Sequence, residues 1–90
     1  MKKMKYSQYA EIAKVGDIIM LGGMGIVDGL RHMCKESCYN VMDVSDRKNI
    51  YIRKHNKKNW VMVAPSYMEQ DCVLFSKSEY KKLPNTIFGY

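Results

Sequence analysis

The sequence predicts a mainly β protein of the α+β class, with five to six short strands and a short helix near each end. Three observations support this prediction. Short runs of alternating or β-branched residues recur along the chain, turn-forming clusters separate them, and helix-capping residues occur at Ser7 and Ser76. We therefore expect a small curled antiparallel sheet or a partly open barrel. An open antiparallel sheet with helices on one face is the alternative.

Length and composition predict one compact domain, spanning residues 1–90. A chain of 90 residues has room for one core, and 47% hydrophobic with 27% charged residues is typical of a globular protein. The longest apolar run, 18–27, is about half the ~20 residues that a membrane helix needs. The N-terminal residues do not fit a secretory signal peptide, and three cysteines, an odd number, fit free thiols. We expect a cytoplasmic protein that does not contact membranes.

The first predicted element is a short helix near the N-terminus. Ser7 can cap this helix, and Gly16 can end it. Its apolar face would consist of Tyr6, Tyr9, Ile12 and Ala13, which follow helical spacing.

The stretch "VGDIIMLGGMGIVDG" predicts two strands joined by glycine turns. We place strands at 17–21 and 25–27, and turns at 22–25 and 28–29. The stretch resembles the opening of SH3-like and KOW modules, in which a Gly-Asp precedes the first strand and a Gly-Ile-Val precedes the second. The resemblance covers about a sixth of the chain. It implies an SH3-like, partly open barrel and assigns no functional residue.

The middle of the chain predicts a three-stranded meander. Residues 30–37 have no clear period and are expected to form an irregular connection, whereas "CYNVMDV" alternates as a strand does. The cluster "SDRKN" supplies a turn, and two further strands follow at 50–55 and 60–64, where Pro65 ends the second.

The C-terminal part predicts a turn or single helical turn at 66–71, a strand at 72–75 and a helix. Ser76 and Glu79 have the spacing of a capping box, and Phe75 and Tyr80 that of a hydrophobic staple. The helix should begin at Lys77 and end before the proline at position 84.

The most distinctive feature is a cation-rich segment, 47–58, which holds six Lys or Arg residues and no acid. With a turn at 56–59, His55 would pair with Trp60 and Arg53 with Met62. Because cross-strand partners share a face, one face would then be apolar, with Ile50, Ile52, Val61 and Val63. The opposite face would carry Tyr51, Arg53, His55, Trp60 and Met62. A shift of one residue would instead bury Trp60.

Cations interleaved with aromatic rings are typical of surfaces that bind single-stranded nucleic acid. The net charge of +6 also favours anionic partners. We therefore expect a small basic, non-enzymatic protein that binds nucleic acid or nucleotides. The predicted binding residues are Arg47, Lys48, Tyr51, Arg53, His55, Lys57, Lys58 and Trp60.

Two other functions remain open at this point. The hairpin could dock on an acidic protein surface, as an inhibitor or accessory factor of the kind found among small bacteriophage proteins. Alternatively, a homo-oligomer could hold a small anionic ligand between subunits. Salt dependence of nucleic-acid binding, pull-down of a protein partner and the oligomeric state would separate these possibilities.

Catalytic and metal-binding patterns are weak. His32, Cys34 and Cys38 lie close in sequence, and Cys72 and His55 could complete a zinc site, but Cys-x3-Cys is not a usual zinc spacing. Two histidines without paired carboxylates leave little general-base capacity. We expect no catalytic residues, no metal and no cofactor.

Overall fold

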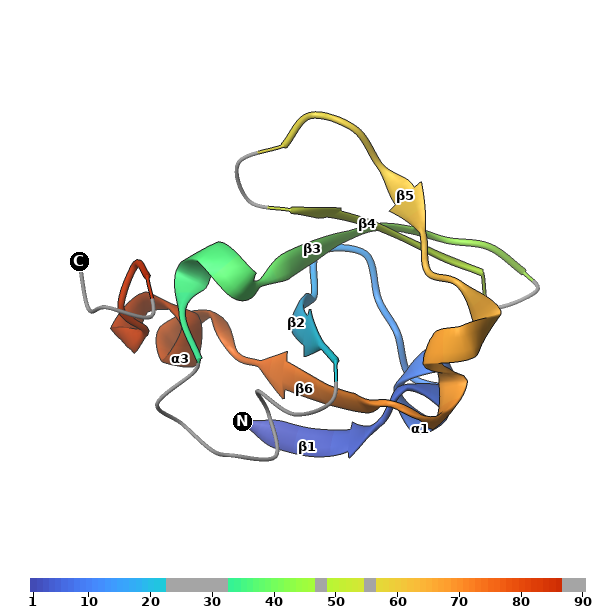
Figure 1. The fold of residues 1–90 in the computed structure, drawn as a ribbon, viewed down its shortest axis with the longest axis horizontal. Coiled ribbons are helices and arrows are strands. Elements are labelled where there is room, and N and C mark those ends of the chain that lie inside the picture. Colours follow the sequence, from blue (N-terminus) through green and yellow to red (C-terminus); the bar gives the residue numbers. More distant parts are fainter. Residues whose placement is uncertain (23–32, 47–48, 55–56, 87–90) are drawn as a thin grey trace.

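Six strands form one antiparallel sheet in the order β1-β6-β2-β3-β4-β5 (Figure 1). The computed structural model describes residues 1–22, 33–46, 49–54 and 57–86. The strands are β1 (Lys2–Lys5), β2 (Ile18–Leu21), β3 (Tyr39–Val44), β4 (Ile50–Lys54), β5 (Val61–Met62) and β6 (Asp71–Phe75). The predicted mainly β fold is confirmed, and the curled sheet is consistent with a partly open barrel.

The neighbouring strands β2 and β6 carry buried side chains on both faces, because successive side chains of a strand point to opposite sides. Ile19 and Cys72 face an inner cluster completed by Tyr6, Tyr9, Ala10, Val41, Ile50 and Ile52. Met20 and Val73 face an outer cluster that also contains Met33, Cys38 and Phe75. The core therefore lies on both sides of β2 and β6. We call the side of the sheet that carries the first cluster the inner face.

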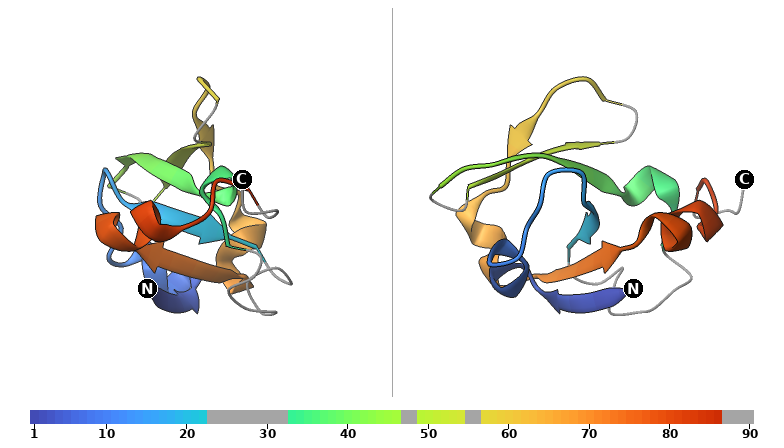
Figure 2. Two further views of the ribbon diagram at one scale, coloured as in Figure 1. Left: turned by 90° about the vertical axis from the view of Figure 1, so that its left-hand side faces the viewer. Right: turned by 180° about the vertical axis from the view of Figure 1, so that it is seen from behind.

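The N-terminal helix α1 (Tyr6–Ala10) lies against the 3-10 helix η3 (Pro65–Glu69), as the right view of Figure 2 shows, and contributes Tyr6, Tyr9 and Ala10 to the inner cluster. Tyr9 is fully buried, and its hydroxyl donates a hydrogen bond of 2.8 Å to Asp17 Oδ2. The same oxygen accepts a bond of 3.0 Å from the Lys14 amide. Asp17 thus connects the buried helix to the start of β2.

The C-terminal helix α3 (Lys77–Lys82) packs on the outer cluster through Tyr80, and Leu83, directly after the helix, packs there too. Its predicted capping box is confirmed: the Glu79 amide donates to Ser76 Oγ at 3.2 Å, and the Ser76 amide donates to Glu79 Oε1 at 2.8 Å. The segment after α3 accepts two backbone bonds from the 3-10 helix η2 (Lys35–Ser37). Backbone hydrogen bonds therefore connect η2 to the segment that follows α3.

The meander β3-β4-β5 is confirmed, with a shift in register between Val41 and Asp43 that leaves Met42 as an extra residue in β3. On the far side of this irregularity, Tyr39 pairs with Lys54 and Val41 with Ile52. The predicted β4–β5 register is wrong by two residues, because Ile52 pairs with Val61 and not with Val63. An even shift keeps each residue on its predicted face, so Ile50 and Ile52 are still buried.

Three other predictions need correction. Ser7, the predicted cap, lies inside α1, whose N-cap is Lys5. The helix ends at Ala10, before Gly16 is reached, and Ile12 is 50% exposed although it was placed on the apolar face. In addition, the strand β1 was not predicted. The chain has already left the helix at Ile12, so helical spacing no longer applies there. The turn predicted at 22–25 lies mostly outside the described residues, and the strand at 25–27 and the turn at 28–29 lie wholly outside them.

Candidate anion-binding site

The segment between β4 and β5 carries exposed cations and an exposed indole ring. The Lys57 amide donates a hydrogen bond of 3.0 Å to the carbonyl of Lys54, the last residue of β4. Lys57, Lys58 and Asn59 are exposed, and Trp60 is 53% exposed. The tryptophan that a shifted register would have buried is therefore available to solvent.

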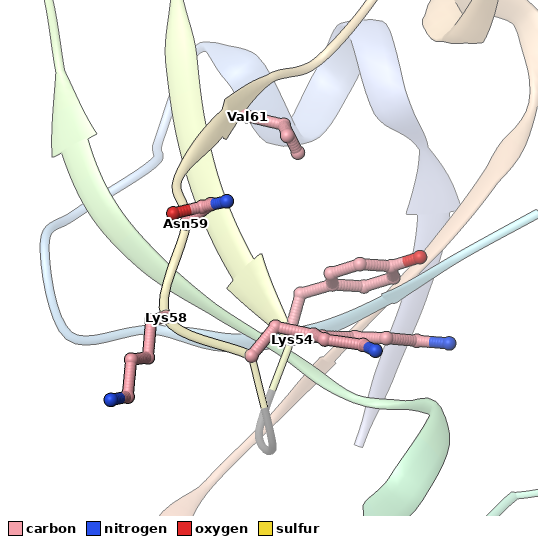
Figure 3. A pocket seen from close by; sticks show the side chains of 6 residues that line it. Lys54, Lys58, Asn59 and Val61 are labelled. Atoms are coloured by element: carbon pink, nitrogen blue, oxygen red, sulfur yellow. The ribbon is translucent and has the colours of Figure 1, made fainter.

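A surface hollow of about 280 Å³ lies beneath this segment (Figure 3). We call it the hairpin hollow. Its walls are Tyr39, Lys54, Lys57, Lys58, Asn59 and Val61. Val61 is 54% exposed although a core position was predicted for it, because the hollow beside it is open to solvent.

Strand pairing brings Tyr39 and Lys54 together. The two residues are register partners in β3 and β4, on the same face as the buried pair Val41 and Ile52. The hairpin hollow therefore continues the inner face beyond the end of the hydrophobic core. The Lys54 ammonium lies 5.9 Å from the centroid of the Tyr39 ring, within the range of a cation–π interaction.

The charge of the hairpin hollow is of one sign. Three of its six lining residues are lysines, and none is acidic. A second hollow, of about 240 Å³ at the start of β1, contrasts with it because Asp17 and Glu79 are among its lining residues. Of these two surface hollows, the hairpin hollow is the one whose walls favour an anion.

The sheet divides the predicted binding residues between two faces. Tyr51 and Arg53 lie on the face opposite the hairpin hollow, and both are half-buried. Arg53 Nε is buried and has no hydrogen-bond partner among the described residues. Lys57 and Lys58 line the hollow instead. Arg47, Lys48 and His55 lie outside the described residues.

Four residues of the hairpin hollow were not among the predicted binding residues: Tyr39, Lys54, Asn59 and Val61. Val61 was predicted to lie on the apolar face, and no binding role was predicted for Lys54. Tyr39 lies 15 positions before Lys54 in the sequence. The alternation of "CYNVMDV" placed Tyr39 on the same face as Val41. This was the one feature of the sequence that indicated on which side of the sheet Tyr39 lies.

The strand β5 forms one edge of the sheet and exposes apolar side chains. Met62 is 48% exposed, next to Trp60 and Val61. The opposite edge, β1, carries Lys2, Lys3 and Lys5, which are exposed. Charged residues protect a sheet edge from pairing with another chain, and β5 lacks them. Of the two edges, β5 is therefore the one better suited to pair with a strand of another chain.

The cysteines do not form a reactive or metal-binding cluster in the described part of the chain. Cys34, Cys38 and Cys72 are free and buried, and burial raises the pKa of Cys38 and of Cys72 to about 12. Cys38 and Cys72 belong to different core clusters. No group of three or more potential metal ligands occurs among the described residues, which do not include His32 or His55.

Within residues 1–22, 33–46, 49–54 and 57–86, no helix has the length and apolar character needed to cross a membrane. No protein-family model, curated protein or solved structure matches the chain, so the geometry of the hairpin hollow and the β5 edge carries the functional argument.

Proposed function

We propose that the protein binds single-stranded nucleic acid through the β4–β5 hairpin. One observation carries the proposal: a hollow with three lysines and a tyrosine ring but no acid is also lined by Asn59 and Val61, the two sequence neighbours of the exposed Trp60. The lysines supply charge for the phosphates, and the two aromatic side chains supply surfaces on which bases can stack.

Contacts with phosphates and contacts with bases both add to the affinity along a nucleic-acid strand. Each phosphate that a lysine neutralises releases counterions, which makes binding strongly dependent on salt. Each base that stacks on an aromatic ring contributes roughly 1–3 kcal/mol and requires no particular sequence. Trp60 lies between Asn59 and Val61, which both line the hollow, so a strand that crosses the β5 edge can use both kinds of contact.

The first test is a titration of Trp60 fluorescence with short single-stranded DNA and RNA, at low and at moderate salt. Trp60 is the single tryptophan of the chain, so its emission reports this surface alone. We expect quenching that weakens steeply as salt increases. Emission that no oligonucleotide changes would contradict the proposal.

A charge-matched pair of variants makes the test specific. Lys54→Ala with Lys57→Ala removes two cations from the hairpin hollow, whereas Lys77→Ala with Lys81→Ala removes two from α3. We expect a much larger loss of affinity for the first pair. Equal losses would mean that net charge alone attracts the nucleic acid, and the hairpin would then have no special role.

The β5 edge favours a second candidate function, docking of an acidic segment of another protein. An extended chain could pair with β5, cover Val61 and Met62, and place carboxylates near the lysines of the hairpin. Binding of a partner protein would then persist in Trp60→Ala, which removes an aromatic ring but keeps the lysines and the β5 edge. Met62→Lys, which charges the edge as β1 is charged, should weaken this docking and leave oligonucleotide binding intact.

A further inference from the structure

We infer that the hairpin hollow is a single-nucleotide site, in which the base contacts the Tyr39 ring and the phosphate lies at Lys54 and Lys57. The inference rests on the proposed function and makes it more specific, because it assigns one unit of the ligand to one set of residues. It also names Tyr39, on β3, as a determinant of binding outside the hairpin itself.

The size of the hollow suits one small ligand unit. Its volume of about 280 Å³ is close to the lower limit of small-molecule pockets, which is roughly 300 Å³. A hollow of this size can take one nucleotide of a strand, while neighbouring nucleotides lie on the surrounding surface. A duplex, whose bases are paired and stacked, has no free base to insert.

The aromatic wall is held by the sheet. Tyr39 is part of β3, is half-buried and packs against the inner cluster. This packing restricts the movement of its ring. The Lys54 ammonium lies 5.9 Å from the ring centroid. A base that stacks on the exposed part of this ring therefore has a cation within reach of its own phosphate.

The remaining walls have complementary chemistry. In Figure 3, the Val61 side chain and the Asn59 amide lie above the hollow, while Lys58 extends away from Lys54. Val61 provides an apolar contact for the ring of the base. The Asn59 amide has both donors and an acceptor, as reading of a base edge requires. Lys58 is thus the least suited of the three lysines to contact a nucleotide in the hollow.

The decisive experiment compares Tyr39→Leu with Tyr39→Phe. Both variants keep an apolar side chain against the inner cluster, but only phenylalanine keeps a ring. With a fluorescent oligothymidylate as probe, we expect Tyr39→Leu to lose at least about fivefold in affinity, the loss of one stacked base, and Tyr39→Phe to bind as the parent does. The salt dependence should be the same in all three, because no charge changes.

Two controls locate the effect. Tyr51→Leu removes a ring from the opposite face and should change oligonucleotide affinity much less than Tyr39→Leu does.

Adenosine monophosphate should shift the amide NMR signals of residues in the hairpin hollow at lower concentration than inorganic phosphate does. Equal effects of the two ligands would indicate a simple anion site and would overturn the inference.

The outcomes separate the inference from the proposed function. If oligonucleotides bind in a salt-dependent way but Tyr39→Leu binds normally, the single-nucleotide site is wrong and the proposed function stands. If adenosine monophosphate binds at the hollow but no oligonucleotide binds, the inference stands and the proposed function fails.

Should Tyr39→Leu not fold, photocrosslinking of the unmodified protein to an oligonucleotide with 5-iodouracil bases provides the alternative. A crosslink at Tyr39 supports the inference. Crosslinks found only at Tyr51 or Trp60 contradict it.

Discussion

Lys54 and Tyr39 are direct cross-strand partners, and the ammonium of the lysine lies 5.9 Å from the centroid of the tyrosine ring. The sheet register therefore fixes a cation beside an aromatic ring. Positions on strands hold functional groups more accurately than positions on loops do. This pair is the rigid part of the hairpin hollow, while Lys57 and Lys58 belong to the connecting segment.

The first prediction concerns the charge of this pair. Lys54→Met keeps most of the side-chain stem and removes the ammonium, so we expect weaker oligonucleotide binding and a shallower salt dependence. The loss of one phosphate contact should reduce the slope of log K against log salt by roughly 0.7 for a single strand. Lys58→Met is the matched control, because Lys58 extends away from Lys54 in Figure 3. Equal changes in both variants would contradict the role given to Lys54.

The second prediction concerns Trp60, which is 53% exposed. Because the ring is not part of the core, Trp60→Ala should change the free energy of unfolding by no more than about 0.5 kcal/mol, as is usual for surface substitutions. Oligonucleotide affinity, measured by anisotropy, should fall by roughly fivefold or more and should be retained in Trp60→Phe. A marked loss of stability in urea would show that Trp60 supports the fold.

Local signals in the sequence predicted several elements well. The capping box of Ser76 and Glu79 is confirmed because the two residues interact with their own helix end and need no distant partner. The strand β1 was missed because three of its four residues are lysines, and its strand conformation comes from pairing with β6. A charged edge strand has no hydrophobic pattern of its own.

The lining of the hairpin hollow was predicted only in part, because its geometry depends on pairing between segments. The β4–β5 register was wrong by two residues, since the length of a hairpin loop cannot be read from cations and asparagines alone. The shift was even, so Tyr51 and Arg53 stayed on the predicted face. The proximity of Tyr39 to Lys54 required the β3–β4 register, which no local pattern specifies.

The third prediction concerns the hydrogen bond between Tyr9 and Asp17. The Asp17 carboxylate accepts from the buried Tyr9 hydroxyl and from the Lys14 amide. Asp17→Ala leaves that hydroxyl without its acceptor, and we expect a loss of about 1.5–3 kcal/mol in the free energy of unfolding. Urea denaturation measures this loss. In a Tyr9→Phe background the cost of Asp17→Ala should be smaller, and an unchanged cost would mean that the bond contributes nothing.

The fourth prediction concerns Gly16, whose φ is +96°. An added Cβ would meet no atom within 4 Å, so any cost of Gly16→Ala comes from the backbone alone. We expect a destabilisation of about 1–3 kcal/mol, which is typical of a non-glycine residue held at positive φ. Gly16→Asn should cost less, because asparagine tolerates left-handed conformations better than alanine does. Equal stability of the alanine variant and the parent in urea would contradict the conformation described for this turn.

The last prediction concerns pH and the N-terminus of α3. The pKa of Glu79 is lowered to about 2, first by its hydrogen bond with the amino group of Met1 and then by the backbone amide and hydroxyl of Ser76. A carboxylate in an unfolded chain titrates near about 4.3, so protons bind more readily to the unfolded state. The contribution of Glu79 to stability is therefore complete above about pH 4.3 and is lost as the pH falls through about 2.

Glu79→Gln tests this relation, because glutamine can still accept the bond from the Ser76 amide but carries no charge. The melting temperature of the variant should lie below that of the parent at neutral pH, and the difference should disappear toward about pH 2, where the parent carboxyl becomes protonated. The Ser76 hydroxyl also stabilises the charged form of Glu79. In a Ser76→Ala background, the difference in melting temperature between Glu79 and Glu79→Gln should therefore be smaller at neutral pH. A difference that stays constant down to about pH 2 would show that the charge of Glu79 does not stabilise the fold.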